Sequence, residues 1–253
     1  MKNMLSGVVL LLLTLLWLLP AEADTAMPLV VVDQGHGQRF RIEDQGELQL
    51  TRFADVLRGQ GLQVRAATSA LTDTTLGEAS GLVISGPFQS LAPEEVEAVV
   101  RFVRRGGRLA AMLHIGAPLA DLLQQLHVDI SNAVLHERRN IIDSDLNFRV
   151  TGLPGSPLFA GIKEFSVYGA WALNSTEPGA TQVGTSNQAW IDLNGDGMLS
   201  KGDVAGTFSV VIANALDNGG FVIFGDDALF QNRYLEGDNA RLAANLGAWL
   251  AGK

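Results

Sequence analysis

The hydrophobic pattern of the first half of the chain alternates between continuous apolar runs and amphipathic segments. The runs "PLVVVD" at 28–33 and "GLVISG" at 81–86 are mostly apolar, which is typical of parallel strands covered on both faces. Residues 93–105 predict a helix, because valines recur at helical spacing, acidic residues follow Pro93 and arginines precede Gly106. This alternation predicts an α/β fold with a mainly parallel sheet and helices on both faces.

The same pattern gives approximate bounds for the remaining elements of this kind. The expected strands are 28–33, 62–68, 81–86, 108–113 and 220–226. The expected helices are 47–58, 93–105, 117–126 and 238–252.

The pattern changes at about residue 131. Short β-like pieces such as "NFRVTG" and "TFSVVIANAL" follow one another, with glycine and proline between them. We interpret the segment 131–215 as an antiparallel, β-rich extension inserted into a single domain that spans 28–253.

The first residues have the features of a secretory signal. Lys2 precedes an apolar run that ends in Ala21-Glu22-Ala23, a small-residue cleavage signal. The run is shorter than the ~20 apolar residues of a membrane span. We therefore predict a cleaved signal peptide at 1–23, a periplasmic or secreted protein, and no stable membrane span after cleavage. The alternative is that the segment is retained as an anchor.

The absence of cysteine and the negative net charge exclude some kinds of site and make some kinds of partner unfavourable. The chain has no cysteine, which excludes disulfides, thiolate metal sites and a cysteine nucleophile. Its net charge is −9, and removing 1–23 takes away one basic and one acidic residue, so the charge is unchanged. Nucleic acid and anionic membranes are poor partners for such a chain. We expect an unknown protein, glycan or small-molecule ligand instead.

The segment "WIDLNGDGMLSKGD" at 190–203 carries the most specific chemical pattern. Calcium loops place oxygen ligands at positions 1, 3, 5, 7, 9 and 12, with glycine at position 6. Counting from Asp192 puts Gly197 at position 6. The predicted Ca²⁺ ligands are Asp192, Asn194, Asp196, the Met198 carbonyl, Ser200 and Asp203.

Two features distinguish this loop from the helix–loop–helix calcium site. Position 12 is aspartate, as in the dockerin-type loops that the segment resembles, where the other form has glutamate. The flanking segments alternate like strands, so the loop is expected to join two strands. The alternative is a polar hairpin turn without metal, since Asn-Gly and Asp-Gly are strong turn dipeptides.

A second group of candidates follows the predicted parallel strands. Ligands bind beyond the carboxyl ends of such strands. Here those ends carry Asp33 and His36, then His114, then Asp226. These four residues could form a polar cleft with acid–base chemistry. In the alternative interpretation, the aspartates cap neighbouring loops or helices, His36 is an exposed loop residue, and His114 is a hydrogen-bonded residue on a shelf.

Four segments together carry a family resemblance. They are "VVVDQGHGQRF", "GLVISGPFQSLAPEEVEAVVRFVRRGGRLAAML", "WIDLNGDG" and "FVIFGDDALFQNRYLEGDNARLAANLGAWL". They resemble uncharacterised bacterial domains with a class I glutamine amidotransferase-like fold, which are similar to domains of gliding-motility transport and intraflagellar-transport proteins. The resemblance implies a flavodoxin-like sheet. It does not imply amidotransferase activity, because His114 stands near the place of the family's cysteine and the chain has none.

Three functions are therefore compatible with the sequence. The first is a secreted or periplasmic, non-catalytic module that binds a ligand or partner and has a structural calcium site. The second is a hydrolase that uses His36 with Asp33 or Asp226. The third is an auxiliary component of an export or surface-assembly system.

Overall fold

The computed structural model describes residues 27–252. The predicted signal peptide at 1–23 lies outside the described residues. Within 27–252, no helix is long and apolar enough to cross a membrane.

The parallel strands form one half of a large mixed sheet, in the order β14-β4-β3-β1-β2. Their bounds are β1 Leu29–Asp33, β2 Gln63–Ala67, β3 Ala79–Ser85, β4 Arg108–Met112 and β14 Gly219–Phe224. Because all five run in the same direction, their carboxyl ends meet at one edge of the sheet, as the sequence predicted.

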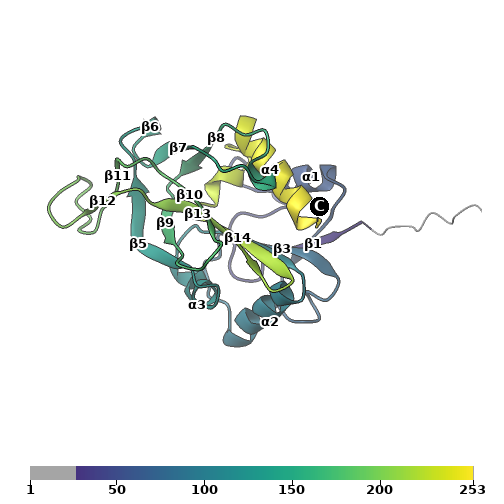
Figure 1. The fold of residues 1–253 in the computed structure, drawn as a ribbon. Coiled ribbons are helices and arrows are strands. Elements are labelled where there is room, and N and C mark those ends of the chain that lie inside the picture. The colour runs from purple at the N-terminus through teal and green to yellow at the C-terminus, as the bar shows by residue number, and fades with distance from the viewer. Residues whose placement is uncertain (1–26, 253) are drawn as a thin grey trace, which may run out of the picture.

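Helices cover both faces of these strands (Figure 1). On one face lie α1, Thr51–Gly59, and α4, Gly237–Leu250, while α2, Pro93–Arg104, and α3, Ala120–Gln125, lie on the other. A hydrophobic core lies on each face of the sheet, and alternate side chains of each strand point into one core or the other. On β1, for example, Val30 and Val32 face α1 and α4, whereas Val31 packs on the α2 side. The α/β class with helices on both faces is confirmed.

The start of α2 shows how local sequence determines this arrangement. Pro93 occupies the first turn, where a missing N–H costs nothing. The Glu95 carboxylate accepts a hydrogen bond of 2.8 Å from the backbone N–H of Ala92, and the carbonyl of Ala92 accepts one from the N–H of Glu95. Two otherwise unpaired N–H groups are satisfied in this way, and the carboxylate is held at the sheet edge.

The second half of the sheet is antiparallel, which confirms the predicted extension. It continues from β14 through β13, β9, β5 and β11 to β12, and β10 also pairs with β13. The bounds are β5 Asp129–His136, β9 Trp171–Asn174, β10 Thr181–Gly184, β11 Ala189–Ile191, β12 Val204–Gly206 and β13 Ser209–Leu216. A separate three-stranded sheet packs near α4 (Figure 1) and consists of β6 Ile141–Ser144, β7 Asn147–Thr151 and β8 Glu164–Tyr168.

Some predicted bounds differ from the structure for clear reasons. The helix expected at 47–58 begins only at Thr51, because the N–H of Leu50 bonds to the Arg41 carbonyl and so joins the preceding loop. The helix expected at 117–126 is divided. It starts as a short 3₁₀ turn, Ala117–Leu119, and continues as α3.

Candidate functional site

The predicted cleft residues divide between the two faces of the sheet. Asp33 ends β1 on the α2 side, where its partner His36 contacts Glu95 of α2. Asp226 follows β14 and accepts a 2.8 Å hydrogen bond from the backbone N–H of Tyr168 on β8, which packs on the opposite face. The structure therefore brings Asp33 together with His36 but separates this pair from Asp226.

His36 lies between two carboxylates. Its Nδ1 atom is 2.9 Å from both oxygens of Asp33, and its Nε2 atom is 3.1 Å from both oxygens of Glu95. Gln38 adds a hydrogen bond from its amide to Asp33, and the Glu95 carboxylate also accepts the N–H of Leu71. Only 6 % of His36 is exposed, so its interpretation as an exposed loop residue was wrong. The ring is buried because it lies between Asp33 at the end of β1 and Glu95 at the start of α2.

The electrostatics of this group oppose a role as a catalytic base. The hydrogen bond with Asp33 raises the pKa of His36 to about 9, against the opposing effect of burial, and Glu95 raises it further. A general base at neutral pH must hold an unprotonated nitrogen that faces the substrate. His36 is protonated there, and both its nitrogens are engaged. We conclude that His36, Asp33 and Glu95 have a structural role: their hydrogen bonds connect β1 and the loop after it to α2.

His114 has a different environment at the carboxyl end of β4. Its Nδ1 atom lies 3.2 Å from Oδ1 of Asp227, and 38 % of its side chain is exposed. The hydrogen bond with Asp227 raises the pKa of His114, which favours the protonated form of the ring. This arrangement matches the interpretation of His114 as a hydrogen-bonded residue on a shelf.

Two aromatic rings flank His114. The ring centroids of Phe40 and Phe88 lie 5.2 and 5.0 Å from that of His114. The guanidinium of Arg39 lies 4.5 Å from the centroid of Phe88. Both phenylalanines are partly exposed. We name Arg39, Phe40, Phe88 and His114 the edge surface; it combines an arginine and a histidine with two apolar rings.

Behind the edge surface, two adjacent carboxyl groups are buried. Burial raises the pKa of Asp226 to about 8 and also raises that of Asp227, whose hydrogen bond to His114 acts in the opposite direction. Asp226 accepts backbone N–H groups of Tyr168 and Ala228. Oδ2 of Asp227 points at Gly86, where an added Cβ would lie 2.3 Å away. Gly86, with a φ of +54°, is thus required for this close approach.

Sequence reasoning missed the residues that define these two environments. Glu95 appeared to be an ordinary acidic residue of a helix first turn, and Asp227 was only a neighbour of Asp226. Phe40 and Phe88 lie in loops, where apolar residues form no period. The position of Glu95 three residues after Ala92, the residue that precedes the helix, is the one sequence signal that could have indicated its inward direction.

The acidic loop joins β11 to β12, which pair antiparallel, so its position between strands is confirmed (Figure 1). Oxygens of Asp192, Asp196 and Asp203 all lie within 4.8 Å of one another. Gly197 has a φ of +74°, as the glycine at position 6 of a calcium loop requires. The three carboxylates converge from the positions that the pattern assigns to ligands.

The remaining predicted ligands lie around this group. The amide nitrogen of Asn194 donates to Asp196 at 3.1 Å and to Oγ of Ser200 at 2.8 Å, and Asp203 accepts the N–H of Ser200 at 2.7 Å. Met198 is exposed, and its N–H donates to Asp196. Carboxylate, amide and hydroxyl oxygens form the donor set that a hard cation prefers, so the residues fit Ca²⁺.

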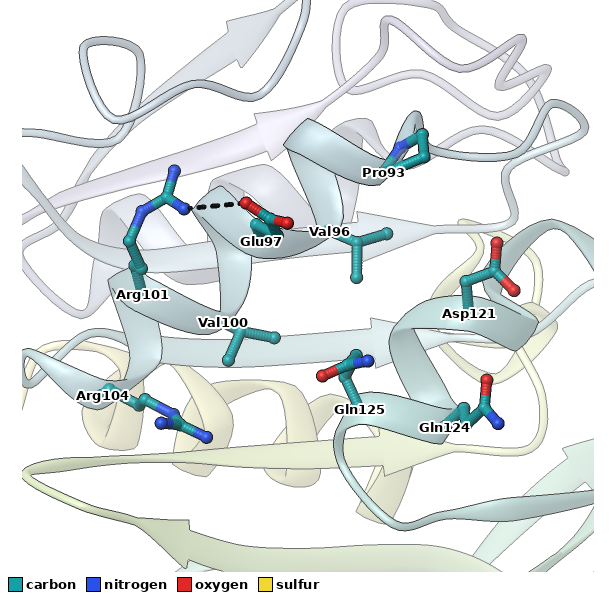
Figure 2. A pocket seen from close by; sticks show the side chains of 9 residues that line it. All are labelled: Pro93, Val96, Glu97, Val100, Arg101, Arg104, Asp121, Gln124 and Gln125. Atoms are coloured by element: carbon teal, nitrogen blue, oxygen red, sulfur yellow. Dashed lines mark hydrogen bonds and ion pairs between the residues drawn. The ribbon is translucent and has the colours of Figure 1, made fainter.

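A groove of about 500 Å³ lies elsewhere, between α2 and α3 (Figure 2). Val96 and Val100 are apolar residues in its lining, and Arg101 pairs with Glu97 at 3.4 Å beside them. None of the residues predicted for the cleft or for the acidic loop lines this groove. The acidic and basic side chains that line this groove belong to α2 and α3. The groove is therefore separate from the candidate site at the ends of the strands.

The structure defines an α/β domain with a carboxylate-bound histidine, His114, just beyond the carboxyl end of β4. Over residues 47–246 the chain matches the model of a family described as a domain of unknown function, DUF4350. The chain belongs to this family. No curated protein sequence matches it.

Solved structures support the fold. The N-terminal domain of mmIFT52 superposes with a TM-score of 0.70 at 14 % identity, covering 88 % of this chain and 97 % of that domain. A putative ThuA-like protein from Bacteroides uniformis ATCC 8492 gives 0.54 at 12 %, covering 92 % and 95 %. A cytoplasmic protein from Salmonella typhimurium LT2 gives 0.55 at 12 %, covering 88 % and 99 %. At these identities the likeness concerns the fold alone, and it confirms the expected similarity to an intraflagellar-transport domain.

Proposed function

We propose that this chain is a non-catalytic binding module whose edge surface holds an acidic segment of a partner protein. The observation that carries the proposal is the environment of His114, which is partly exposed, lies between two phenylalanine rings and has a raised pKa. A carboxylate of the partner would pair with His114 and Arg39, while its apolar side chains would contact Phe40 and Phe88.

The arrangement favours binding over hydrolysis. His36 lacks a free nitrogen, which removes the base that a hydrolase with Asp33 or Asp226 would need. The buried carboxyl group of Asp227 is hydrogen-bonded to His114 and holds its orientation. The overall charge of −9 repels acidic partners in general, so attraction would be confined to the edge surface.

We further propose that the acidic loop binds one structural Ca²⁺ ion and that the protein works outside the cytoplasm, in the periplasm or as a secreted protein. Asp192, Asp196 and Asp203 would supply carboxylates, with Asn194, Ser200 and the Met198 carbonyl completing the shell. Calcium loops of extracellular modules bind at ~10⁻⁴–10⁻³ M, which suits such a compartment. Bound calcium would fix the turn between β11 and β12.

Replacing His114 by asparagine tests the edge surface. The amide nitrogen of asparagine can take the place of Nδ1 and keep the bond to Asp227, but the positive charge is lost. We expect the affinity for the probe peptide acetyl-Glu-Phe-Glu-Phe-Glu-amide at low ionic strength to fall roughly fivefold, with less than about 1 kcal/mol lost in stability. Isothermal titration calorimetry and chemical denaturation measure the two quantities.

Two controls make the result specific. His127→Asn removes an exposed histidine away from the edge surface and should leave affinity unchanged. The peptide with glutamine in place of glutamate should bind weakly to the wild type. Equal binding of both peptides, or equal affinity of wild type and His114→Asn, would show that the edge surface does not recognise acidic segments.

A further inference from the structure

A second cavity lies at the opposite end of the parallel strands. Arg108 is the first residue of β4 and is paired in register with Gly220 of β14, so both stand at the amino ends of their strands. Trp249 of α4 lines this cavity, whose volume is about 620 Å³. Such a volume lies within the range of ~300–1,000 Å³ that small-molecule sites occupy. It is distant in the fold from the edge surface, which lies beyond the carboxyl ends.

The charge of this cavity is unusual for an acidic chain. Among the described residues that line it, Arg108 is the only charged one; the others are apolar, small or amide side chains. In the part of the chain that the structure describes, the Arg108 guanidinium has neither an ion pair nor a hydrogen bond. The acidic residues adjacent in sequence to the lining are directed to other cations: Asp217 lies 3.9 Å from Arg104, and Glu177 lies 3.8 Å from His127.

Arg108 is also held in position. Its guanidinium carbon lies 5.2 Å from the centroid of the Trp249 ring, a cation–π contact that orients the planar group. The Trp249 ring packs close to Gly220, where an added Cβ would stand 3.6 Å from Cζ2 of Trp249, an ordinary contact distance, and 3.0 Å from the Asn214 carbonyl. Both Arg108 and Trp249 are partly buried. A guanidinium group held in this orientation loses little conformational entropy when two of its N–H groups bind an oxyanion.

We infer that this cavity is a binding site for a small organic oxyanion whose flat apolar body packs against Trp249. The uncompensated guanidinium would pair with two oxygens of a carboxylate or phosphate group. The side-chain amide of Asn218 makes no hydrogen bond within the described residues. It can donate to the same oxyanion group at the cavity rim. The site is independent of the edge surface and of the acidic loop.

The test uses benzoate as the probe, benzamide as its neutral counterpart and phenyl phosphate to distinguish the two oxyanions. We expect benzoate or phenyl phosphate to shift the indole N–H signal of Trp249 in nitrogen-15 spectra, whereas benzamide leaves it unchanged. The oxyanion with the lower dissociation constant identifies the class. Arg108→Gln should weaken the binding of that oxyanion about tenfold or more. Arg108→Lys keeps the positive charge but not the planar guanidinium, and it should weaken binding less.

Arg58→Gln is the matched control, because it removes an exposed arginine of α1 that does not line the cavity. It should bind like the wild type. The inference is overturned if benzamide binds as well as the anions, if Arg108→Gln retains wild-type affinity, or if Arg58→Gln weakens binding as much as Arg108→Gln does.

Discussion

Replacing His36 by glutamine is expected to lower the free energy of unfolding by about 3–5 kcal/mol near neutral pH, because it leaves buried carboxylates without their cationic partner. The imidazolium bridges Asp33 and Glu95, which come from different elements of the fold. A glutamine amide can donate to one of these carboxylates but carries no charge. Urea denaturation of wild type and variant measures the difference.

The pH dependence of this loss has a definite sign. The pKa of His36 is raised from 6.5 to about 9 in the folded state, so the folded protein binds the proton more tightly than the unfolded chain does. The stability that the imidazolium contributes is complete below the unfolded value of 6.5 and is lost as pH rises through about 9. The difference between wild type and His36→Gln should therefore shrink by roughly 3 kcal/mol over that window.

An exposed histidine provides the control for this experiment. His127→Gln changes a residue whose side chain is 69 % exposed, so it should alter stability little. Measuring the difference between variants also removes the contribution of Asp226, whose raised pKa weakens the folded state as pH rises. A loss below about 1 kcal/mol for His36→Gln, constant with pH, would contradict a structural role for His36.

Calcium is expected to raise the melting temperature of the wild-type protein. At about 10 mM Ca²⁺ and a dissociation constant of ~10⁻⁴–10⁻³ M, the stabilisation is about 1.4–2.7 kcal/mol, or roughly 3–10 °C for a domain of this size. Asp192→Ala combined with Asp196→Ala removes two of the three converging carboxylates and should abolish the increase. Differential scanning calorimetry with Ca²⁺ and with chelator checks this.

The control must remove the same charge elsewhere. Asp44→Ala combined with Asp55→Ala changes two exposed aspartates outside the loop, and its calcium response should equal that of the wild type. Mg²⁺ at the same concentration should stabilise the wild type less, because it requires a stricter octahedral shell. Melting that is the same with Ca²⁺ and with chelator would reject the calcium site.

The fold was predictable wherever local signals agreed with one another. Around α2, proline, acidic residues, spaced valines and a terminal glycine all indicate the same helix. The four-residue strand β6 was missed, because "IIDS" lies between charged segments and owes its place to pairing with β7. The convergence of the three acidic side chains of the loop was predictable because they lie within twelve residues of one another in sequence.

The cleft was harder to predict because its geometry depends on which side of the sheet each residue faces. Asp33 and Asp226 both follow buried strands, yet they contact elements on opposite faces. The second partner of His36, besides Asp33, is Glu95, which lies 59 residues away in sequence. No local pattern connects these two residues. The exposure of His114 likewise depends on Phe40 and Phe88, which come from separate loops.

His36 is buried with both ring nitrogens bonded, whereas His114 is partly exposed, and one titration tests this contrast directly. Nitrogen-15 spectra of the histidine rings can be recorded over pH, with and without the acidic probe peptide. We predict that His36 stays protonated until about pH 9 and does not respond to the peptide, while the His114 ring signals shift when it is added. A His36 that titrates near 6.5 and shifts with the peptide, with His114 unaffected, would contradict the account.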